Sequence, residues 1–574
     1  MTPDSVRKDL AAAAVITMMA VPQGVAYAVI AGLPPAAGLY ASAVPTVLAA
    51  LGRTSSHVVT GPTNALSLLV GGALAAGAGG GDPVATALLL AFMVGVFQVA
   101  AGVLRLGAVV DYISRAVVLG YITGAGLLIG FGQLGNITGT SMGSGSVAEK
   151  AVTWASGLGQ TDPRSVALAL GSTALLLALR KWVPKVPPAM VVLGLGIGLA
   201  WAFDFPALGL ATAGDLGSVP RGLPPFGFPL QDLSQASALL PVAFAATVLS
   251  MVESSAVARS IAAMTGERLD MDREFIGQGL GNLGAGLTGG YPVSGSLARS
   301  AMNHRAGATS KLSAIASGVM MLGVLLVLGP VVDLTPIASL AGILVVLAWD
   351  LVDREAIQHV LQALWGDRLA FLATVVGTWT LSMDIAIYLG VAISILLFLR
   401  RARNLNVTDL VVRKGHIRET APDDHVEGDH CHRVRALHVE GNLFFGAAGE
   451  LQDALDDAIR DPSVKVLIVR LKRARGLDFT TAGVLMATRA RMRESGRYLI
   501  LAGMTPLTMR LFDRVGLTEA FGDDLFPTES KWFLAMNRAM QRGLELAGTC
   551  DTCPLVKYLD TQDVPEPTED RASA

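Results

Sequence analysis

The sequence has few charged residues, few aromatic residues and very few cysteines. Of its 574 residues, 16% are charged, 6% are aromatic and three are cysteines, whereas 52% are hydrophobic. So few cysteines exclude a disulfide-stapled extracellular scaffold. The net charge is −2 and no basic cluster is interleaved with aromatics, which argues against nucleic-acid binding. The hydrophobic excess is far from the balance of a soluble protein.

The charges that are present are distributed unevenly. Residues 1–403 hold 42 charged residues, whereas the much shorter segment 404–574 holds 48. Charge is scarce in lipid because an ionised side chain at mid-bilayer is costly. The boundary near Arg403 therefore marks the change from a chain surrounded by lipid to a chain surrounded by water. We expect a membrane domain over 1–403, a linker over 404–432, a soluble domain over 433–546 and a mostly disordered, Pro- and acid-rich tail over 547–574.

Apolar segments follow one another from about Leu10 to Leu399. We predict an all-α membrane domain of fourteen transmembrane segments, some of them too short to cross about 30 Å of hydrocarbon. The first apolar run leads into further spans without a convincing cleavage site, so we expect no cleaved signal peptide. The predicted spans are 10–31, 36–51, 63–77, 86–104, 113–133, 165–180, 188–203, 236–257, 274–288, 295–304, 312–329, 336–349, 369–382 and 385–399.

The basic residues orient these spans. Most Lys and Arg residues fall at alternate span ends, on the side of the N-terminus, and only Lys150, Arg164 and Arg221 fall in the opposite loops. The positive-inside rule then places both termini in the cytoplasm. We expect a multi-pass protein of the bacterial cytoplasmic (inner) membrane, in contact with its lipids.

Two spans are interrupted at their start. The third opens with 60–64 (TGPTN) and the tenth with 289–295 (GGYPVSG). Proline lacks an N–H group and restricts the residue before it, so each stretch is predicted to be extended chain that leads into a half-helix. At membrane depth such backbone is tolerated only where protein or a water-filled cavity covers it.

The two interruptions recur at matched positions. Gln23 lies 40 residues before Thr63, and Glu253 lies 40 residues before Val293. We interpret this spacing as a 7+7 inverted repeat over about 10–203 and 236–399, with a substrate site between the half-helices near the midplane. Half-helix N-termini present unpaired N–H groups and positive dipole ends, which favour an anion. The alternative is that Gly and Pro only kink packed helices.

Several ordered blocks resemble the sulfate permease (SulP) family, whose superfamily includes the animal anion exchangers pendrin and prestin. The resemblance covers nearly the whole chain and implies a core domain that moves against a gate domain, and usually a homodimer. The blocks are 22–27 (PQGVAY), 31–35 (AGLPP), 38–40 (GLY), 52–57 (GRTSSH) leading to 60–62 (TGP), and 277–282 (GQGLGN) leading to 294–300 (SGSLARS).

Arg299, just past the second interruption, is the strongest candidate for an anion ligand. A guanidinium beside a helix N-terminus strengthens an anion site, and a basic residue here lies at the substrate site in the resembling family. The alternative is a clamp on neighbouring carbonyls. Ser296 can donate a hydroxyl from the same turn. Ala298 occupies a position that is Ser in several relatives, which removes one donor.

Gln23 and Tyr27 are one helical turn apart on the first span, so they share a face. An amide and a phenol there can hold oxyanion oxygens, or they can hydrogen-bond between helices instead. The family resemblance supports both as substrate-binding residues, together with Thr63.

Glu253 is a carboxylate deep in an apolar span, so it must be paired or protonated. One alternative is a pair with Arg299. The other is a group that couples proton entry to anion uptake. Sodium-driven bicarbonate transporters of the resembling family have Asp at the matching position, so Glu favours protons over sodium.

After Arg403 the periodicity alternates between strands and helices, which predicts a small α/β domain. We expect strands over 434–440, 464–471 and 498–502, and helices over 449–460, 483–495 and 506–515. The order of 441–446 (GNLFFG) and 477–483 (LDFTTAG) resembles a STAS domain, a module shared with anti-sigma-factor antagonists. In those proteins the second loop holds a phosphorylated Ser or Thr. Thr480 and Thr481 are the matching candidates, and a helix-capping hydroxyl is the alternative.

A group of His and Cys residues surrounds this domain, but no second ligand pair stands at a familiar spacing, so we predict no metal site. The group comprises His425, His430, Cys431, His432, His438, Cys550 and Cys553.

Together these patterns predict a secondary transporter of a small anion, with the STAS domain as a regulatory module. Sulfate is favoured, and bicarbonate, fumarate or succinate are further candidates. Proton symport by an elevator-like alternating access is the expected mechanism. A nucleobase permease of the same architecture and a passive anion channel are the alternatives. No nucleophile–base pair or phosphate-binding loop occurs, so we expect neither an enzyme nor a cofactor.

Overall fold

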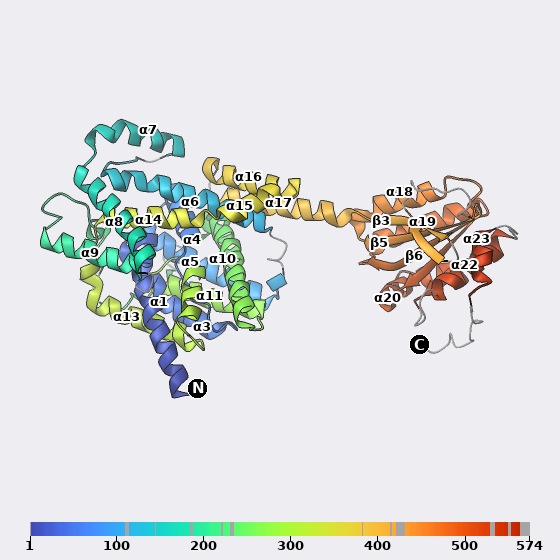
Figure 1. Ribbon diagram of the computed structural model, residues 1–574, viewed down its shortest axis with the longest axis horizontal. Helices are drawn as coiled ribbons and strands as arrows, with labels where there is room; N and C mark the ends of the chain where they lie inside the picture. Colours follow the sequence, from blue (N-terminus) through green and yellow to red (C-terminus); the bar gives the residue numbers. More distant parts are fainter. Residues whose placement is uncertain are drawn as a thin grey trace. The chain divides into compact units, whose positions relative to one another are not determined.

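The computed structural model describes two compact units, Met1–Ile395 and Leu396–Ala574. Figure 1 shows the helical first unit in blue to yellow and the α/β second unit in orange to red. The described residues are 2–108, 114–143, 145–183, 187–219, 222–229, 235–381, 383–413, 416–420, 431–528, 534–548 and 553–562.

Every predicted membrane span coincides with helix in the structure. Seven helical stretches among the described residues, with Pro35–Gly52 counted as one of them, are long and apolar enough to cross a membrane, and Asn64–Ala75 and Pro188–Ala202 are shorter apolar helices. The helices are α1 (Pro3–Ile30), α2 (Pro35–Ser42), α3 (Val44–Gly52), α4 (Asn64–Ala75), α5 (Pro83–Val103), α6 (Arg115–Thr138), α8 (Pro163–Trp182), α9 (Pro188–Ala202), α10 (Ala236–Thr265), α11 (Met271–Leu287), α12 (Leu297–Arg305), α13 (Leu312–Asp333), α14 (Ile337–Leu351), α16 (Trp365–Thr380) and α17 (Met383–Arg403).

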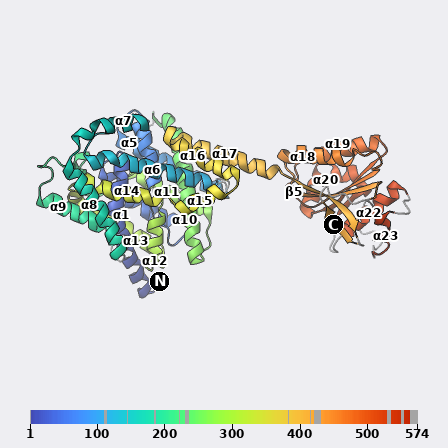
Figure 2. The ribbon, with the colours of Figure 1, turned by 45° about the horizontal axis from the view of Figure 1, so that its top comes forward.

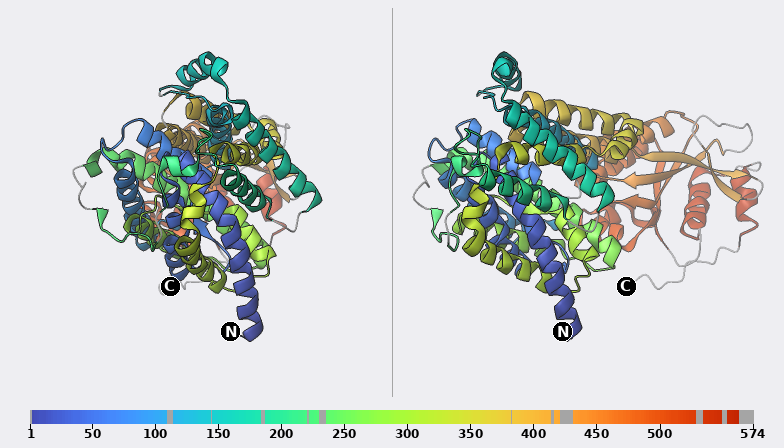
Figure 3. Two further views of the ribbon diagram at one scale, coloured as in Figure 1. Left: turned by 90° about the vertical axis from the view of Figure 1, so that its left-hand side faces the viewer. Right: turned by 60° about the vertical axis from the view of Figure 1, so that its left-hand side comes forward.

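Three local features were not predicted. The span expected over 36–51 is two helices, because Pro45 removes a backbone donor and the chain breaks at Ala43. A helix α7 (Val147–Gly157) begins with a capping box, buries no residue and lies at the edge of the unit (Figure 3). A second extra helix, α15 (Arg354–Gln362), begins at the N-cap Asp353.

The helices of the first unit form two packing groups. In one group α11 packs against α3 and α5, and α1 packs against α2, α12 and α13. In the other, α14 packs against α6 and α8, and α16 packs against α6. In Figure 1 helices α6, α8 and α16 lie above α1, α3 and α11. This grouping matches the core and gate domains that the family resemblance implies.

Glycine allows α1 and α2 to meet backbone to backbone. Gly38 in α2 faces Gly24 in α1, and a Cβ atom at Gly38 would lie 1.8 Å from the Gly24 carbonyl oxygen. The same stretch of α1 holds Gln23 and Tyr27. The close approach therefore fixes the helix face on which two candidate site residues lie.

Gly38→Ala is expected to destabilise the membrane unit by about 3 kcal/mol, because the added methyl must push two backbones apart. The measurement is the midpoint of thermal unfolding in detergent. Gly132→Ala in α6 is the matched control, because a Cβ there meets no atom within 4 Å. Equal midpoints for the two variants would contradict the close packing of α1 and α2.

The second unit is a six-stranded sheet in the order β4-β3-β5-β6-β7-β8. Strands β5 to β8 are parallel, whereas β3 and β4 are antiparallel to their neighbours. The strands are β3 (Asn406–Arg413), β4 (His416–Thr420), β5 (Val434–Asn442), β6 (Val466–Arg475), β7 (Tyr498–Met504) and β8 (Leu525–Pro527). The helices are α18 (Ala448–Ala458), α19 (Phe479–Glu494), α20 (Pro506–Arg514), α21 (Leu517–Phe521), α22 (Leu534–Ala547) and α23 (Pro554–Leu559).

Strand alternation gives this sheet two buried faces. On β6, Leu467 and Val469 face a cluster with α18, α19 and α20, whereas Val466 and Ile468 face α22 and α23. Figure 2 shows α18 and α19 on one side of this sheet and α22 and α23 on the other. The predicted strands and helices of the domain all occur.

The segment 404–432, which we expected to be a linker, contributes β3 and β4 to the sheet. Buried apolar residues in β3 and the pairing of β3 with β5 account for this, since they give the segment a place in the core. Within the expected tail, α23 packs on the sheet through Leu555 and Tyr558, and residues 563–574 lie outside the described part.

Candidate functional site

The two interrupted segments lie side by side and pair as a short antiparallel sheet. In it β1 (Thr60–Gly61) pairs with β2 (Ser294–Gly295), with Thr60 opposite Gly295 and Gly61 opposite Ser294. The pairing satisfies backbone groups that hydrocarbon leaves without partners. Because the strands are antiparallel, α4 and α12 leave the pair in opposite directions, and their N-termini converge on it.

Arg299 lies in the first turn of α12 and is only 1% exposed. Its Nη2 donates to the Pro62 carbonyl oxygen at 2.7 Å, and a Cβ atom added at Gly61 would lie 2.3 Å from Nη1. The guanidinium therefore covers β1 directly. Its Nε is buried without a hydrogen-bond partner among the described residues, which leaves a donor for a further group.

Glu253 lies on α10, partly buried, next to the start of α4. The Thr63 hydroxyl donates to its Oε2 at 3.0 Å, and Thr63 is also the N-cap residue of α4. Within the described residues Glu253 and Arg299 form no ion pair, so the structure does not contain the Glu253–Arg299 pair that was one alternative for this carboxylate. The carboxylate and the guanidinium thus flank the paired segment as separate charges.

Helix α1 adds two further polar candidates. It packs against both half-helices, α4 and α12. Gln23 is 8% exposed, and its Oε1 is buried without a partner in the described part of the chain. Tyr27 is 7% exposed and lies within electrostatic range of Arg299 and Glu253. The structure therefore gathers these polar groups around the helix ends.

The two other candidates lie at the start of α12. Ser296 is the N-cap residue of α12, and its hydroxyl accepts a hydrogen bond from the backbone N–H group of Arg299 at 3.5 Å. Ala298 is exposed in the first turn, next to Arg299 in the chain. Ser296 thus acts as a helix cap, and its orientation is fixed by that role.

Several buried residues around this point were not predicted. The Tyr291 hydroxyl lies 2.9 Å from the Ser67 hydroxyl and joins the stretch before β2 to α4. Tyr291 is fully buried and lies within electrostatic range of Arg299. The sequence signal for this role is the tyrosine within the Gly-Gly-Tyr-Pro interruption. Its hydrogen-bond partner could not be predicted, because Ser67 lies 224 positions away.

Gln278 on α11 is the central residue of the scaffold. Its Nε2 donates to the Val293 carbonyl oxygen at 2.8 Å. Its Oε1 accepts from the Thr60 hydroxyl at 3.0 Å, from the Ser254 hydroxyl at 3.0 Å and from Arg53 Nη2 at 3.2 Å. One side chain thus joins β1, α10 and the chain entering β2. In the sequence, the block 277–282 indicates only the family resemblance and not this role of Gln278.

Asn282, one turn further along α11, completes the support of this chain. Its Oδ1 accepts from the Val293 N–H group at 2.7 Å, and its Nδ2 donates to the Val293 carbonyl oxygen at 3.0 Å. The same Nδ2 donates to Gln98 Oε1 on α5 at 2.8 Å. Two amide side chains therefore satisfy extended backbone that has no helix of its own.

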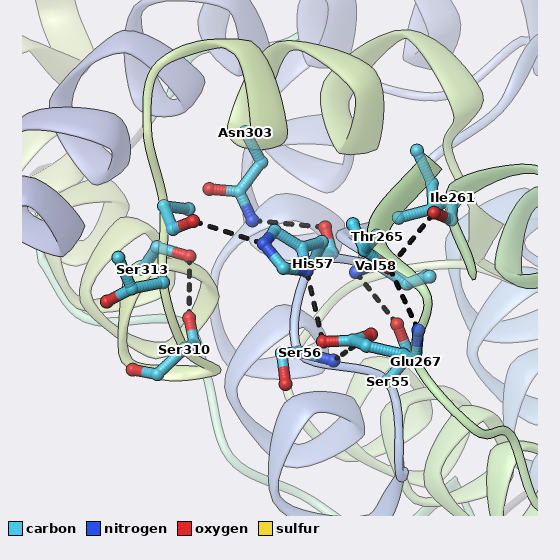
Figure 4. Close-up of polar contacts among 12 residues, drawn as sticks. Ser55, Ser56, His57, Val58, Ile261, Thr265, Glu267, Asn303, Ser310 and Ser313 are labelled. Carbon is cyan, nitrogen blue, oxygen red and sulfur yellow. Dashed lines mark hydrogen bonds and ion pairs between the residues drawn. The ribbon is translucent and has the colours of Figure 1, made fainter. Parts of the chain in front are cut away.

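The loop before β1 is held at its other end by a polar cluster (Figure 4). His57 Nδ1 lies 3.2 Å from Glu267 Oε1, and His57 Nε2 lies 3.1 Å from the Ala308 carbonyl oxygen. Asn303 of α12 donates to the His57 carbonyl oxygen at 3.0 Å. The loops that precede β1, α11 and α13 are thereby fastened together.

The two candidate phosphorylation residues, Thr480 and Thr481, differ in exposure. Asp478 is the N-cap residue of α19, and Thr481 closes its capping box. Thr481 is fully buried and donates to the Leu443 carbonyl oxygen at 3.0 Å, whereas Thr480 is exposed. Thr480 is therefore the accessible member of the candidate phosphorylation pair.

The His and Cys group is only partly described. His425, His430 and Cys550 lie outside the described residues. In the part of the chain that the structure describes, no three His, Cys, Asp or Glu side chains form a group able to hold a metal ion.

The inverted pair of interrupted helices, set among apolar helices, defines a multi-pass membrane transporter. The chain belongs to the sulfate permease family, whose sequence profile matches residues 6–374, and a STAS domain profile matches residues 426–531. The membership makes an anion the substrate and makes the protein a transporter rather than an enzyme.

Two relatives illustrate the similarity in sequence. The chain is 29% identical over 528 residues to the putative sulfate transporter YvdB of Bacillus subtilis, covering 91% of this chain and 96% of the relative. It is 28% identical over 523 residues to the probable sulfate transporter Rv1739c of Mycobacterium tuberculosis, covering 90% and 93%.

Solved structures confirm the predicted fold class. The murine Slc26a9 anion transporter in its inward-facing state aligns with a TM-score of 0.85 at 19% identity, covering 95% of this chain and 92% of that one. The transmembrane domain of the cyanobacterial bicarbonate transporter BicA aligns with a TM-score of 0.58 at 22% identity, covering 68% and 98%.

Proposed function

We propose that this chain is a secondary active transporter that takes up a small oxyanion, with sulfate as the favoured substrate. The names of its relatives support sulfate, and the bicarbonate transporter with the same fold keeps bicarbonate as a further candidate. Fumarate and succinate fit the same positive site, since they also present carboxylate oxygens. The substrate-binding residues of the proposal are Gln23, Tyr27, Thr63, Ser296, Ala298 and Arg299.

The observation that carries this proposal is the position of Arg299. Its guanidinium is buried where two helix N-termini converge, and no carboxylate among the described residues forms an ion pair with it. A buried cation without a counter-ion is unfavourable, so a dianionic or monoanionic solute is stabilised there. Planar N–H donors match the oxygens of sulfate and carboxylates.

We assign proton coupling to Glu253. Its hydrogen bond from Thr63 ties the carboxylate to the N-terminus of α4, one of the two helix ends that favour an anion. An ionised carboxylate there opposes the binding of a second negative group. Protonation removes that opposition, so proton and anion bind together. Protons are favoured over sodium because the residue is Glu rather than the Asp of sodium-driven relatives.

The remaining parts of the proposal concern assembly and regulation. The packing group that holds the anion site (α1, α3, α5, α11 and α12) moves as the core against the group of α6, α8, α14 and α16 in an elevator-like alternating access, and the STAS domain regulates the movement. The chain forms a homodimer in the bacterial inner membrane, with both termini in the cytoplasm. The transport domain covers 1–403, and the STAS domain is centred on 433–546, with β3, β4 and α23 packed onto it and Thr480 as a phosphorylation site.

Uptake into proteoliposomes tests the function. We expect radiolabelled sulfate to accumulate above equilibrium when the outside is acidic, and a protonophore to abolish the accumulation. Bicarbonate, fumarate and uracil are the competitors to compare. Uptake that stops at equilibrium under every gradient would indicate a passive channel instead. Competition by uracil alone would indicate a nucleobase permease, which needs carboxylates that hydrogen-bond a base.

A further inference from the structure

Two of the three cysteines, far apart in the sequence, meet in the second unit. Cys431 lies directly before β5 and Cys553 is the N-cap residue of α23. Both are free thiols, with exposed fractions of 9% and 2%. They belong to one apolar cluster, between the sheet and helices α22 and α23. The pairing was invisible in the sequence, where Cys553 has Cys550 as its nearest cysteine.

The two thiols are neighbours within this buried cluster. The Cys553 thiol and the backbone N–H groups of Arg433 and Val434 act as donors toward the Cys431 sulfur. These donors lower the pKa of the Cys431 thiol, whereas the contact with Cys431 raises the pKa of the Cys553 thiol. Of the two sulfurs, Cys431 is therefore the one that more readily forms a thiolate, the form that attacks a disulfide.

We propose that Cys431 and Cys553 form a redox-active dithiol site that a low-molecular-weight disulfide, such as oxidised glutathione, converts to an intramolecular disulfide. A metal does not explain the pair, since no third ligand accompanies it among the described residues. The site is independent of the anion site, because both cysteines belong to the second unit.

The chemistry balances in two exchange steps. The Cys431 thiolate attacks one sulfur of the small disulfide, forms a mixed disulfide and releases one thiolate. Cys553 then loses its proton to that thiolate, and its sulfur attacks the Cys431 sulfur and releases the second thiolate, which takes from water the proton that Cys431 gave up when it ionised. Two protein thiols are oxidised by two electrons, and one small disulfide is reduced to two thiols.

The bond has a structural consequence for the end of the domain. Cys553 begins α23, which packs against β3 and α22, whereas Cys431 leads into the central part of the sheet. Oxidation would fasten α23 to the start of β5 covalently. The reduced form relies for this on packing by residues such as Leu555 and Tyr558.

The test uses the full chain, purified in detergent after reduction and treatment with a chelator. It is incubated with oxidised glutathione, its free thiols are alkylated, and it is digested without reductant for mass spectrometry. We expect a linked peptide pair that contains Cys431 and Cys553 and lacks two hydrogens. Cys550→Ser should retain the link, whereas Cys431→Ala and Cys553→Ala should each abolish it.

Two outcomes would overturn the proposal. One is full alkylation of Cys431 and Cys553 after incubation with excess oxidised glutathione at alkaline pH. The other is a dominant link between Cys550 and Cys553 that persists in Cys431→Ala. Thermal unfolding of each variant is measured beside the wild type. If one variant is misfolded, its lost link is disregarded and the variant of the other cysteine decides the test.

Discussion

Arg299→Ala is expected to weaken sulfate binding by about 100-fold. The substitution removes a buried guanidinium whose charge-assisted hydrogen bonds to an oxyanion are worth about 3 kcal/mol together, and each 1.4 kcal/mol corresponds to about tenfold in Kd. It also removes the hydrogen bond from Nη2 to the Pro62 carbonyl oxygen. Binding to the purified protein, measured by calorimetry, gives Kd without the complication of transport.

Two control variants separate charge from structure. Arg305→Ala removes an exposed arginine from the last turn of the same helix and is expected to leave Kd unchanged. Arg299→Lys keeps the charge but loses the planar fork, so an intermediate Kd is expected. Undiminished affinity in a folded Arg299→Ala protein would remove Arg299 from the anion site and leave it as a clamp on Pro62.

Glu253→Gln is expected to abolish accumulation driven by an inward proton gradient. Glutamine has nearly the same shape and can still accept the hydrogen bond from Thr63, but it cannot take up a proton. Proteoliposomes with an acidic exterior should then only equilibrate sulfate. Exchange of internal for external sulfate at equal pH should persist, because that exchange needs no net proton movement.

The matched control for this variant is Glu355→Gln, which changes an exposed carboxylate at the start of α15. It should accumulate sulfate as the wild type does. Accumulation that survives unchanged in Glu253→Gln would show that another group, or no group, couples protons to the anion. Loss of exchange together with accumulation would point instead to a role of Glu253 in holding α4.

The membrane spans and the two half-helices could be predicted because each leaves a local mark. Lipid excludes charge, so the spans appear as charge-poor runs. Pro62 and Pro292 cannot continue a helix, so they mark the interruptions. The matched offsets from Gln23 and Glu253 then predicted that the interruptions belong together, and the pairing of Thr60 with Gly295 agrees with that prediction.

The supporting network could not be predicted, because it depends on contacts between distant segments. Gln278 was visible as an amide in an apolar helix, but its acceptor role toward Arg53 joins residues 225 positions apart. No periodicity specifies such partners. The same limit applies to β3, whose short apolar pattern becomes a strand only because β5 provides a hydrogen-bonding edge.

The short β1–β2 pair bears on how the protein is made. The carbonyl oxygen of Pro62 gains its guanidinium donor only after the ribosome has added Arg299, 237 positions later in the chain. Thr60 and Gly61 likewise gain their ladder partners only when Ser294 and Gly295 have been synthesised. The first half of the chain therefore enters the bilayer with backbone groups of β1 that still lack their partners. The inserted helices become a complete domain only after the second half has been synthesised.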